Sequence, residues 1–294
     1  MYDIKTYHRA DSLNKALKLL VDNPEACLVA GGTDVLIKLR HHNKRLQHLV
    51  DIHHLKELTY IKELEDGTVR IGSGTTFTQI MESDIIAQTI PSLAQALTTV
   101  AGPQIRNIAT IGGNICNGAP SADATPPSIV LGAEVEITSL NSARKMLLEQ
   151  FYLAPGKVDL KHNEIATAFL FRKENYQQVG GSYYKYAIRE AMDIATIGCA
   201  AACRIENGVF RLFKLAYGVA APTPIRTPTA EKAALNQPVN EDTLNKIQQA
   251  VLKDVSPRDS WRASKAFRLQ IIHTLAKRVV IKAIANAGGS IEHD

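Results

Sequence analysis

The chain lacks the sequence motifs by which many nucleotide-binding proteins are found. Within its 294 residues, no G-x-G-x-x-G run opens a helix and no G-x-x-x-x-G-K-[ST] run occurs. These absences exclude the usual dinucleotide-binding fingerprint and the P-loop as ways of holding a nucleotide. The nucleophile elbow G-x-S-x-G is also missing, so hydrolysis by a serine triad has no support.

Cysteine is scarce, and its four copies are scattered. Cys27, Cys116, Cys199 and Cys203 form no Cys-x-x-Cys pair. An iron–sulfur cluster needs thiolates at closer spacing, and a disulfide framework is unusual in a chain this large. The histidines at 41–54 lack an acid or a cysteine that would complete a metal site. We therefore expect buried free thiols, no cluster and no metal site in this chain.

Long apolar runs and concentrated charge are absent too. No stretch approaches the length of a membrane span, and the first residues contain no apolar signal core. The net charge of +5 is dispersed, and its densest basic stretch, 38–45, is interpreted as a solvated face. Nucleic-acid binding would require a longer basic stripe. We expect a soluble, cytoplasmic protein that binds neither membrane nor nucleic acid.

Hydrophobic periodicity predicts an α+β protein. A polar, glycine-containing stretch at 173–181 divides it, so we expect one domain over 1–175, with subdomains 1–55 and 56–175, and a smaller domain over 176–294. Asn207-Gly208 between two apolar runs indicates a hairpin. The helices are predicted at 12–23, 35–40, 92–100, 240–251 and 264–286, and the strands at 27–30, 48–52, 58–61, 68–72, 134–138, 165–171, 194–206 and 209–219.

The first segment with chemical potential is the glycine turn Ala30–Asp34. An apolar strand delivers two glycines and a hydroxyl to the start of a helix, which Thr33 or Asp34 can cap. Glycine allows close approach of a ligand to the backbone, and free N–H groups at a helix start attract anions. The turn suits a pyrophosphate, although an ordinary strand–helix turn has the same sequence features.

A second segment, 109–123, is longer and contains few bulky side chains. It contains three glycines, and its lack of helical period predicts a loop. Asn114 and Asn117 offer amides, and the Asp123 carboxylate can accept from ribose hydroxyls. A loop of this length usually has a functional reason, the alternative being a structural loop over a sheet edge. We expect any nucleotide to be held between these two segments.

Two segments about 80 residues apart carry a resemblance to a known family, namely Ala30–Asp34 and Thr110–Ile115. As a pair they resemble the FAD-binding subunits of the xanthine dehydrogenase family of molybdenum hydroxylases. Ala101–Asn107, Lys185–Ala202 and Ser260–Ser264 extend the likeness nearly end to end. The resemblance implies a two-subdomain FAD-binding fold of the vanillyl-alcohol-oxidase (PCMH) type, followed by a smaller α+β domain of the CO dehydrogenase flavoprotein type.

The family's cofactor contacts can be carried over to matching residues of this sequence. The resemblance then implies that the pyrophosphate of FAD lies on the first segment. The second segment would support the pyrophosphate and the isoalloxazine. Val100 stands where some relatives have an aromatic residue, so no stacking is expected there. The implied cofactor contacts are Leu28, Val29, Ala30, Gly31, Gly32, Thr33, Asp34, Val35, Val100, Thr110, Ile111, Gly112, Gly113, Asn114, Asp123, Ile165, Ala166 and Lys185.

The resemblance also implies that the loop after Lys185 lies near the flavin. Arg189 and Asp193 are the candidates for shaping access of the electron acceptor, the alternative being a solvated charged loop. Expected partners are an iron–sulfur chain and a molybdopterin chain that oxidises a purine, in a higher-order assembly of the heterotrimer. This chain would collect electrons on FAD and pass a hydride to NAD, and no side chain is assigned as catalytic.

Three alternatives remain open at the level of sequence. The chain could serve a related aldehyde, carbon monoxide, nicotinate or aromatic-thioester enzyme, since an FAD subunit does not touch that substrate. It could be a self-contained flavin oxidase of the same fold, although no covalent-flavin histidine in a matching context is evident. It could also be an assembly subunit that holds a nucleotide only structurally.

Overall fold

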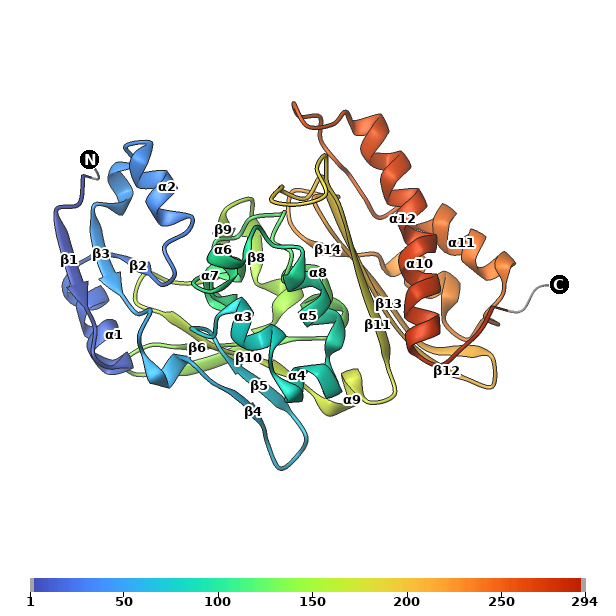
Figure 1. The fold of residues 1–294 in the computed structure, drawn as a ribbon, viewed down its shortest axis with the longest axis horizontal. Helices are drawn as coiled ribbons and strands as arrows, with labels where there is room; N and C mark the ends of the chain where they lie inside the picture. The colour runs from blue at the N-terminus through green and yellow to red at the C-terminus, as the bar shows by residue number, and fades with distance from the viewer. Residues whose placement is uncertain (1–2, 292–294) are drawn as a thin grey trace.

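The computed structural model describes residues 3–291 as three units that follow one another along the molecule. Each unit is built on its own sheet, and a short two-stranded ladder joins β8 (Tyr152–Ala154) to β9 (Lys157–Val158). Figure 1 shows the N-terminal unit at one end, the middle unit beside it and the C-terminal unit at the other end. No helix within residues 3–291 has both the length and the apolar content to cross a bilayer.

The N-terminal unit is a parallel sheet of three strands in the order β1-β3-β2. The predicted first helix is confirmed: Ser12 caps it, and Ala16, Leu17 and Leu20 are buried in the core of the unit. The elements are β1 (Thr6–Arg9), α1 (Leu13–Asp22), β2 (Cys27–Val29), α2 (Val35–Arg40), η1 (Lys44–Leu46), β3 (His48–Asp51) and η2 (Lys56–Leu58).

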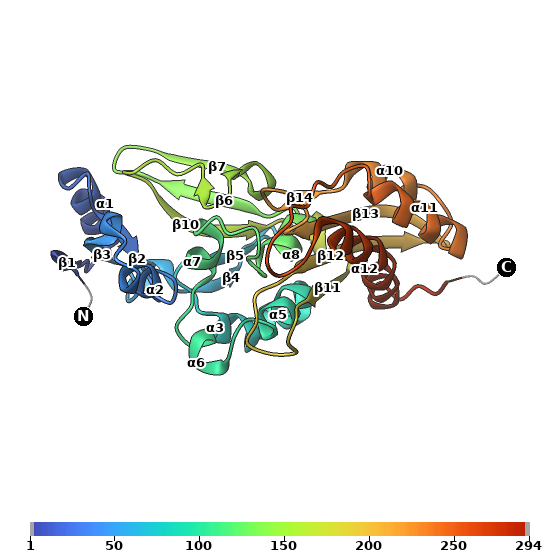
Figure 2. The same ribbon diagram turned by 90° about the horizontal axis from the view of Figure 1, so that it is seen from above.

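The middle unit is an antiparallel sheet in the order β4-β5-β10-β6-β7. Its central strand is buried at all seven residues, which explains why this segment reads as a continuous apolar run. In Figure 2, α3, α5 and α6 lie together on one side of this sheet. The elements are β4 (Ile61–Glu63), β5 (Val69–Gly72), α3 (Phe77–Met81), α4 (Asp84–Thr89), α5 (Pro91–Thr98), α6 (Pro103–Arg106), α7 (Ile111–Cys116), α8 (Thr125–Val130), β6 (Glu134–Thr138), β7 (Ala143–Leu147), η3 (Leu148–Gln150), β10 (Ile165–Phe171) and α9 (Lys173–Tyr176).

The C-terminal unit is an antiparallel sheet in the order β11-β12-β13-β14, covered on one face by helices. The predicted hairpin is confirmed, with Asn207 and Gly208 both at positive φ. The predicted cap of Asn240 on α11 is confirmed as well. The elements are β11 (Gly180–Tyr186), β12 (Ile197–Glu206), β13 (Val209–Gly218), β14 (Ile225–Arg226), α10 (Pro228–Ala234), α11 (Glu241–Val251) and α12 (Lys265–Asn286).

Strand β12 joins the two larger cores because its side chains alternate between them. Cys199 and Cys203 face the core shared with α11 and α12, whereas Ala200 and Ala202 face the core of the middle unit. Small side chains on both faces let both layers approach closely. Burial raises the pKa of both thiols to about 12, so they are packing groups rather than nucleophiles.

Several sequence-based predictions were wrong in detail. The segment 109–123, predicted as a loop, contains the helix α7, in which Ile111 and Ile115 are buried one turn apart. The first hairpin strand begins at Ile61 rather than at residue 58, because Leu58 turns into the core from a 3₁₀ turn. In a stretch for which no helix was predicted, Pro103 opens the short helix α6, where its fixed φ and missing N–H suit the first position.

Candidate functional site

The two glycine segments lie against each other in the structure. A Cβ built on Gly31 would be 2.0 Å from the carbonyl oxygen of Ile108, which directly precedes the second segment. On the same side, Lys38 on α2 donates a hydrogen bond of 2.8 Å from Nζ to Oδ1 of Asn117. The absence of a side chain at position 31 therefore allows the N-terminal unit to meet the middle unit at this point.

The first segment carries free hydrogen-bond donors. The backbone N–H groups of Gly31, Gly32 and Thr33 donate no hydrogen bond within residues 3–291. Gly32 has a φ of +72°, a conformation that glycine adopts without strain. The segment connects β2 to α2, so three donors are presented in one turn between a strand end and a helix start. Such a turn can receive an oxyanion.

The cap predicted for α2 was wrong. Asp34 occupies the N-cap position, but its side chain accepts no cap hydrogen bond. Its backbone is already in the helical region, with φ of −101° and ψ of −40°. The carboxylate instead lies 2.5 Å from Nζ of Lys38, four residues later. The start of α2 is therefore left without a side-chain acceptor.

The second segment differs because its own chain uses its N–H groups. The side chain of Thr110 caps α7 by accepting from the N–H of Gly113, and the N–H of Gly112 is bonded to the carbonyl of Ser73. A Cβ on Gly112 would lie 2.6 Å from that same carbonyl oxygen. A Cβ on Gly113 would meet only Oγ1 of Thr110, at 3.1 Å. Gly112 thus packs against Ser73, the residue that follows β5, whereas Gly113 presents a bare, exposed backbone.

A buried polar cluster follows the second segment. The Asp123 carboxylate accepts a 2.6 Å hydrogen bond from the Tyr183 hydroxyl. It also forms an ion pair with Lys185, whose Nζ lies 3.0 Å away. Lys185 also donates to the carbonyl of Thr99 at 3.0 Å. Both partners of the ion pair have side chains only 8% exposed. The cluster therefore ties β11 to the loop that leads into α8 and to the end of α5.

Burial shifts the pKa values of the acidic groups in this cluster. Desolvation raises the pKa of Asp123, while the Lys185 ammonium and the hydrogen bond from Tyr183 oppose that rise. Burial and the neighbouring Asp123 carboxylate raise the pKa of Tyr183 well above its ordinary value. Tyr183 therefore stays protonated and acts as a hydrogen-bond donor.

Sequence reasoning missed Tyr183 and Thr99. Tyr183 could have been found from the two-residue repeat of a strand. It stands two residues before Lys185, so both side chains lie on the same face of β11. Asn114 completes the connection, since its Oδ1 accepts from the N–H of Ala124 at 3.4 Å. Asp123 is thus held from α7 on one side and from β11 on the other.

The backbone carbonyls of the turn that contains Val100 accept hydrogen bonds from the side chains of Arg106 and Lys185. The Arg106 guanidinium donates to the carbonyls of Val100 and Ala101, at 2.8 and 3.1 Å. Ala101 has a φ of +42°, an unusual conformation for a residue with a Cβ. Because Thr99 is bonded to Lys185, this turn belongs to the same cluster as Asp123.

Ile165 and Ala166 begin the central strand β10 behind the glycine segments. Both residues are buried, with 1% and 5% of their whole surface exposed. The ladder between β10 and β6 is irregular between Ala166 and Ala168. The N–H of Ser73 donates to the carbonyl of Thr167 there, at 3.0 Å. This local break in pairing lies next to the contact of Gly112 with Ser73.

Arg189 and Asp193 lie apart from these clusters, in the loop between β11 and β12. Asp193 shapes the loop by accepting from the backbone N–H groups of Ile188, Arg189 and Ile194. Arg189 donates to the carbonyl of Met192 at 2.9 Å, and its side chain is 67% exposed. The two predicted residues are brought together, but neither is hydrogen-bonded to a glycine segment.

The site as built fits a dinucleotide cofactor. It presents three free N–H donors for an anion and, at Gly113, a bare surface that a Cβ would fill. A buried carboxylate–ammonium pair lies further along. On one side of the donors lie Leu28 and Val29 of β2 and the following Ala30, and on the other lies Val35 of α2. Ile111 supports α7 from the core.

Comparison with known proteins shows which family this arrangement represents. A family model described as the FAD binding domain in molybdopterin dehydrogenase matches residues 2–171, and one described as the CO dehydrogenase flavoprotein C-terminal domain matches 182–283. The xanthine dehydrogenase FAD-binding subunit of Escherichia coli O157:H7 is 54% identical over 292 residues, which cover 99% of this chain and 100% of that protein. The chain belongs to the family of FAD-binding subunits of molybdenum hydroxylases.

More distant relatives match over nearly the whole chain. A solved structure of carbon monoxide dehydrogenase from Hydrogenophaga pseudoflava superposes with a TM-score of 0.93 at 28% identity, covering 97% of this chain and 99% of that one. The glyceraldehyde dehydrogenase medium chain of Sulfolobus acidocaldarius is 29% identical over 274 residues, covering 93% of this chain and 96% of that protein. The predicted fold, an FAD-binding unit followed by a smaller C-terminal unit, is confirmed.

Proposed function

We propose that this FAD subunit serves a xanthine dehydrogenase. In this proposal it receives electrons from an iron–sulfur partner chain and delivers them to NAD. A third chain would carry molybdopterin and oxidise the purine, and the heterotrimer would form a larger assembly in the cytoplasm. The 54% identity to a xanthine dehydrogenase subunit, against 29% to chains named for other substrates, favours the purine enzyme.

The observation that carries the cofactor assignment is the set of free N–H groups at Gly31, Gly32 and Thr33. In our proposal these groups bind the pyrophosphate of FAD. The bare backbone at Gly113 leaves room for the cofactor beside α7. FAD, when bound, supplies the conversion between single electrons and a hydride pair. The protein's own contribution is binding and positioning, and no side chain is assigned as a general acid or base.

The Asp123–Lys185 pair has a positioning role in this proposal. It holds β11, and with it the loop that contains Arg189 and Asp193, against the Val100 turn. Asp193 then fixes the shape of that loop through three backbone hydrogen bonds. The exposed guanidinium of Arg189 remains available to an incoming acceptor. The chain thereby links the cofactor segments to a loop suited to controlling acceptor access.

The first experiment separates the flavin assignment from its alternatives. The absorption spectrum of the purified chain, with FAD added if needed, is expected to show flavin bands at one FAD per chain. A chain that binds no FAD would contradict the proposal. Co-purification with iron–sulfur and molybdenum chains, and reduction of NAD by xanthine in the reconstituted complex, test the partners and the substrate. A chain that oxidises an organic substrate without partners would favour a self-contained oxidase.

The second experiment tests the acceptor loop. Asp193→Ala removes the acceptor of three backbone N–H groups and should lower NAD turnover of the complex by roughly tenfold or more, an effect of about 1.4 kcal/mol on the barrier. FAD content should stay at the wild-type level, because the hydrogen bonds and ion pair of Asp193 stay within its own loop. Glu190→Ala, an exposed change in the same loop, is the matched control. Equal loss of FAD and turnover would assign the loop a structural role.

A further inference from the structure

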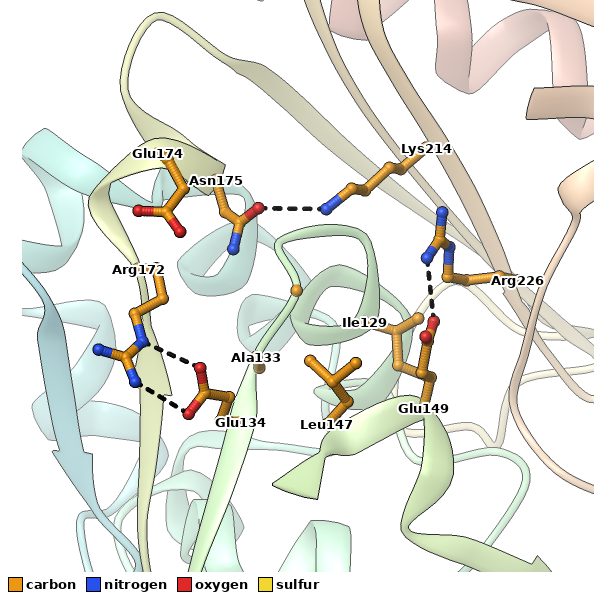
Figure 3. A pocket seen from close by; sticks show the side chains of 11 residues that line it. Ile129, Ala133, Glu134, Leu147, Glu149, Arg172, Glu174, Asn175, Lys214 and Arg226 are labelled. Atoms are coloured by element: carbon orange, nitrogen blue, oxygen red, sulfur yellow. Dashed lines mark hydrogen bonds and ion pairs between the residues drawn. The ribbon is translucent and has the colours of Figure 1, made fainter. Parts of the chain in front are cut away.

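Two clusters of polar side chains join the middle unit to the C-terminal unit, and their charges are matched in different ways. The cluster around Lys214 lines a pocket of about 250 Å³ and contains as many cations as carboxylates (Figure 3). Its charged members are Arg172, Lys214, Arg226, Glu134, Glu149 and Glu174. Arg172 is bonded to Glu134, and Arg226 is bonded to Glu149, as the dashed lines in Figure 3 show. These charges neutralise one another, so the pocket indicates no charged ligand.

The cluster around Asp123 is different, because both oxygens of one carboxylate accept hydrogen bonds from the same strand. Oδ1 accepts a bond of 2.6 Å from the Tyr183 hydroxyl, and Oδ2 accepts one of 3.0 Å from Nζ of Lys185. Both donors belong to β11. A carboxylate offers about four lone-pair positions, so acceptor capacity remains after these two bonds. Asp123 can therefore accept from a ligand without losing either protein partner.

The Tyr183 hydroxyl is held in place by its surroundings. Only 3% of the residue is exposed. On the neighbouring strand β12, a Cβ built on Gly198 would lie 2.8 Å from the hydroxyl oxygen, so the glycine leaves the space that the hydroxyl occupies. The backbone N–H of Tyr183 donates to Oε1 of Gln95 on α5, at 3.3 Å. Packing against β12 and a hydrogen bond to α5 thus fix the donor that Asp123 uses.

Tyr183 supplies this donor without adding a charge. Burial raises the pKa of Asp123, and the Lys185 ammonium and the Tyr183 hydroxyl oppose that rise. Tyr183 itself stays protonated, because burial and the Asp123 carboxylate raise its pKa well above the ordinary value. A neutral donor of this kind favours the ionised carboxylate over the protonated one.

Few other titratable groups face this cluster. The helices α5 and α8, which pack against β11, contain no charged residue. Strand β12 contributes the thiol of Cys199, whose pKa burial raises to about 12. On α6, the Arg106 guanidinium is directed to backbone carbonyls of the turn that contains Val100. The ionisation of Asp123 is therefore controlled by its burial and by the two donors of β11.

We infer that Tyr183 is a positioning residue for the cofactor. Its hydroxyl holds the ionised Asp123 carboxylate in place, so that the remaining lone pairs accept from a hydroxyl group of FAD. The inference rests on the proposed function, with Asp123 as one of the cofactor contacts. The family resemblance implies such contacts at Asp123 and Lys185 but not at Tyr183, which acts on FAD only through Asp123.

The test is the pH dependence of FAD binding by Tyr183→Phe, measured as the Kd in fluorescence titrations of the FAD-free chain. Loss of one hydrogen bond to a carboxylate should raise the pKa of Asp123 by about one unit. The pH at which FAD binding weakens should rise by the same amount. The ratio of the variant's Kd to the wild-type Kd should grow as the pH falls and approach about tenfold. A ratio that does not change with pH would mean a purely structural role and would overturn the inference.

Two further variants serve as controls. Tyr217→Phe removes a buried hydroxyl on the opposite face of the same sheet, where it donates to the Ile272 carbonyl at 3.0 Å. Its Kd ratio should stay constant with pH. Asp123→Asn removes the titrating group, so adding Tyr183→Phe to it should also give a constant ratio relative to Asp123→Asn alone. A ratio that grows at low pH in either experiment would contradict the role of Tyr183.

The FAD-free chain separates this inference from the proposed function. Because the hydroxyl favours ionised Asp123, the deficit in Tm of Tyr183→Phe relative to wild type should be largest at neutral pH. It should shrink as the pH falls and Asp123 is protonated. If wild type binds no FAD at any pH, the proposed function fails and this inference fails with it. If wild type binds FAD but the deficit in Tm does not change with pH, only the inference fails.

Discussion

The first and second glycine segments are alike in sequence and different in use. Each contains adjacent glycines, Gly31-Gly32 and Gly112-Gly113, and in each pair the first glycine packs against protein backbone. The N–H groups of the first segment are free, whereas those of Gly112 and Gly113 are bonded within the chain. The first segment is therefore suited to holding an anion through donors. The second is suited to letting a ligand approach an exposed, side-chain-free surface.

The largest expected effect on stability is at Gly31. Gly31→Ala places a Cβ 2.0 Å from the Ile108 carbonyl oxygen, and backbone atoms on both sides cannot move aside cheaply. We expect a loss of about 3 kcal/mol in the free energy of unfolding, in the upper range for overpacking. Urea denaturation of the FAD-free chain measures it. A loss below about 0.5 kcal/mol would contradict the contact between the two segments.

Gly112→Ala tests the corresponding position in the second segment. Its Cβ would lie 2.6 Å from the Ser73 carbonyl oxygen, but the change also improves helix propensity by about 1 kcal/mol. We expect a net loss of about 1–2 kcal/mol, smaller than that of Gly31→Ala. The same denaturation experiment compares the two variants. A reversed order would show that the tighter contact is in the second segment.

Gly32→Ala separates backbone strain from close packing. The nearest atoms to a Cβ at this position belong to the Leu36 side chain at 3.6 Å, so only the φ of +72° opposes the change. We expect a loss of about 1 kcal/mol. Gly156→Ala is the matched control, because it has the same φ of +72° and nothing within 4 Å. If Gly32→Ala cost much more than the control, the turn would be more crowded than the structure shows.

Part of this architecture could be predicted from the sequence because it is local. Ser12 and Asn240 cap helices whose apolar residues recur at helical spacing, and Asn207-Gly208 closes a hairpin between alternating strands. Helix α7 was missed because its two glycines, Gly112 and Gly113, obscured its period. Ile111 and Ile115, four residues apart and both buried, held the signal.

The polar contacts could not be predicted, because they join segments far apart in the chain. Tyr183 and Asp123 are separated by 60 positions, and Lys38 and Asn117 by 79. Nothing in the local pattern pairs these residues. Their pairing depends on how β11 and α2 pack against the middle unit, which is decided by the burial of apolar faces. The pocket at Lys214 likewise exists only where several elements of two units meet.

The central claim is that Gly113 leaves the space that FAD occupies, and Gly113→Val tests it most directly. A Cβ there meets only Oγ1 of Thr110, so the FAD-free variant should unfold within about 0.5 kcal/mol of wild type. The ratio of bound FAD to protein, measured by absorbance after desalting, should fall from one to below one tenth. A variant that retains one FAD per chain with unchanged stability would contradict the account.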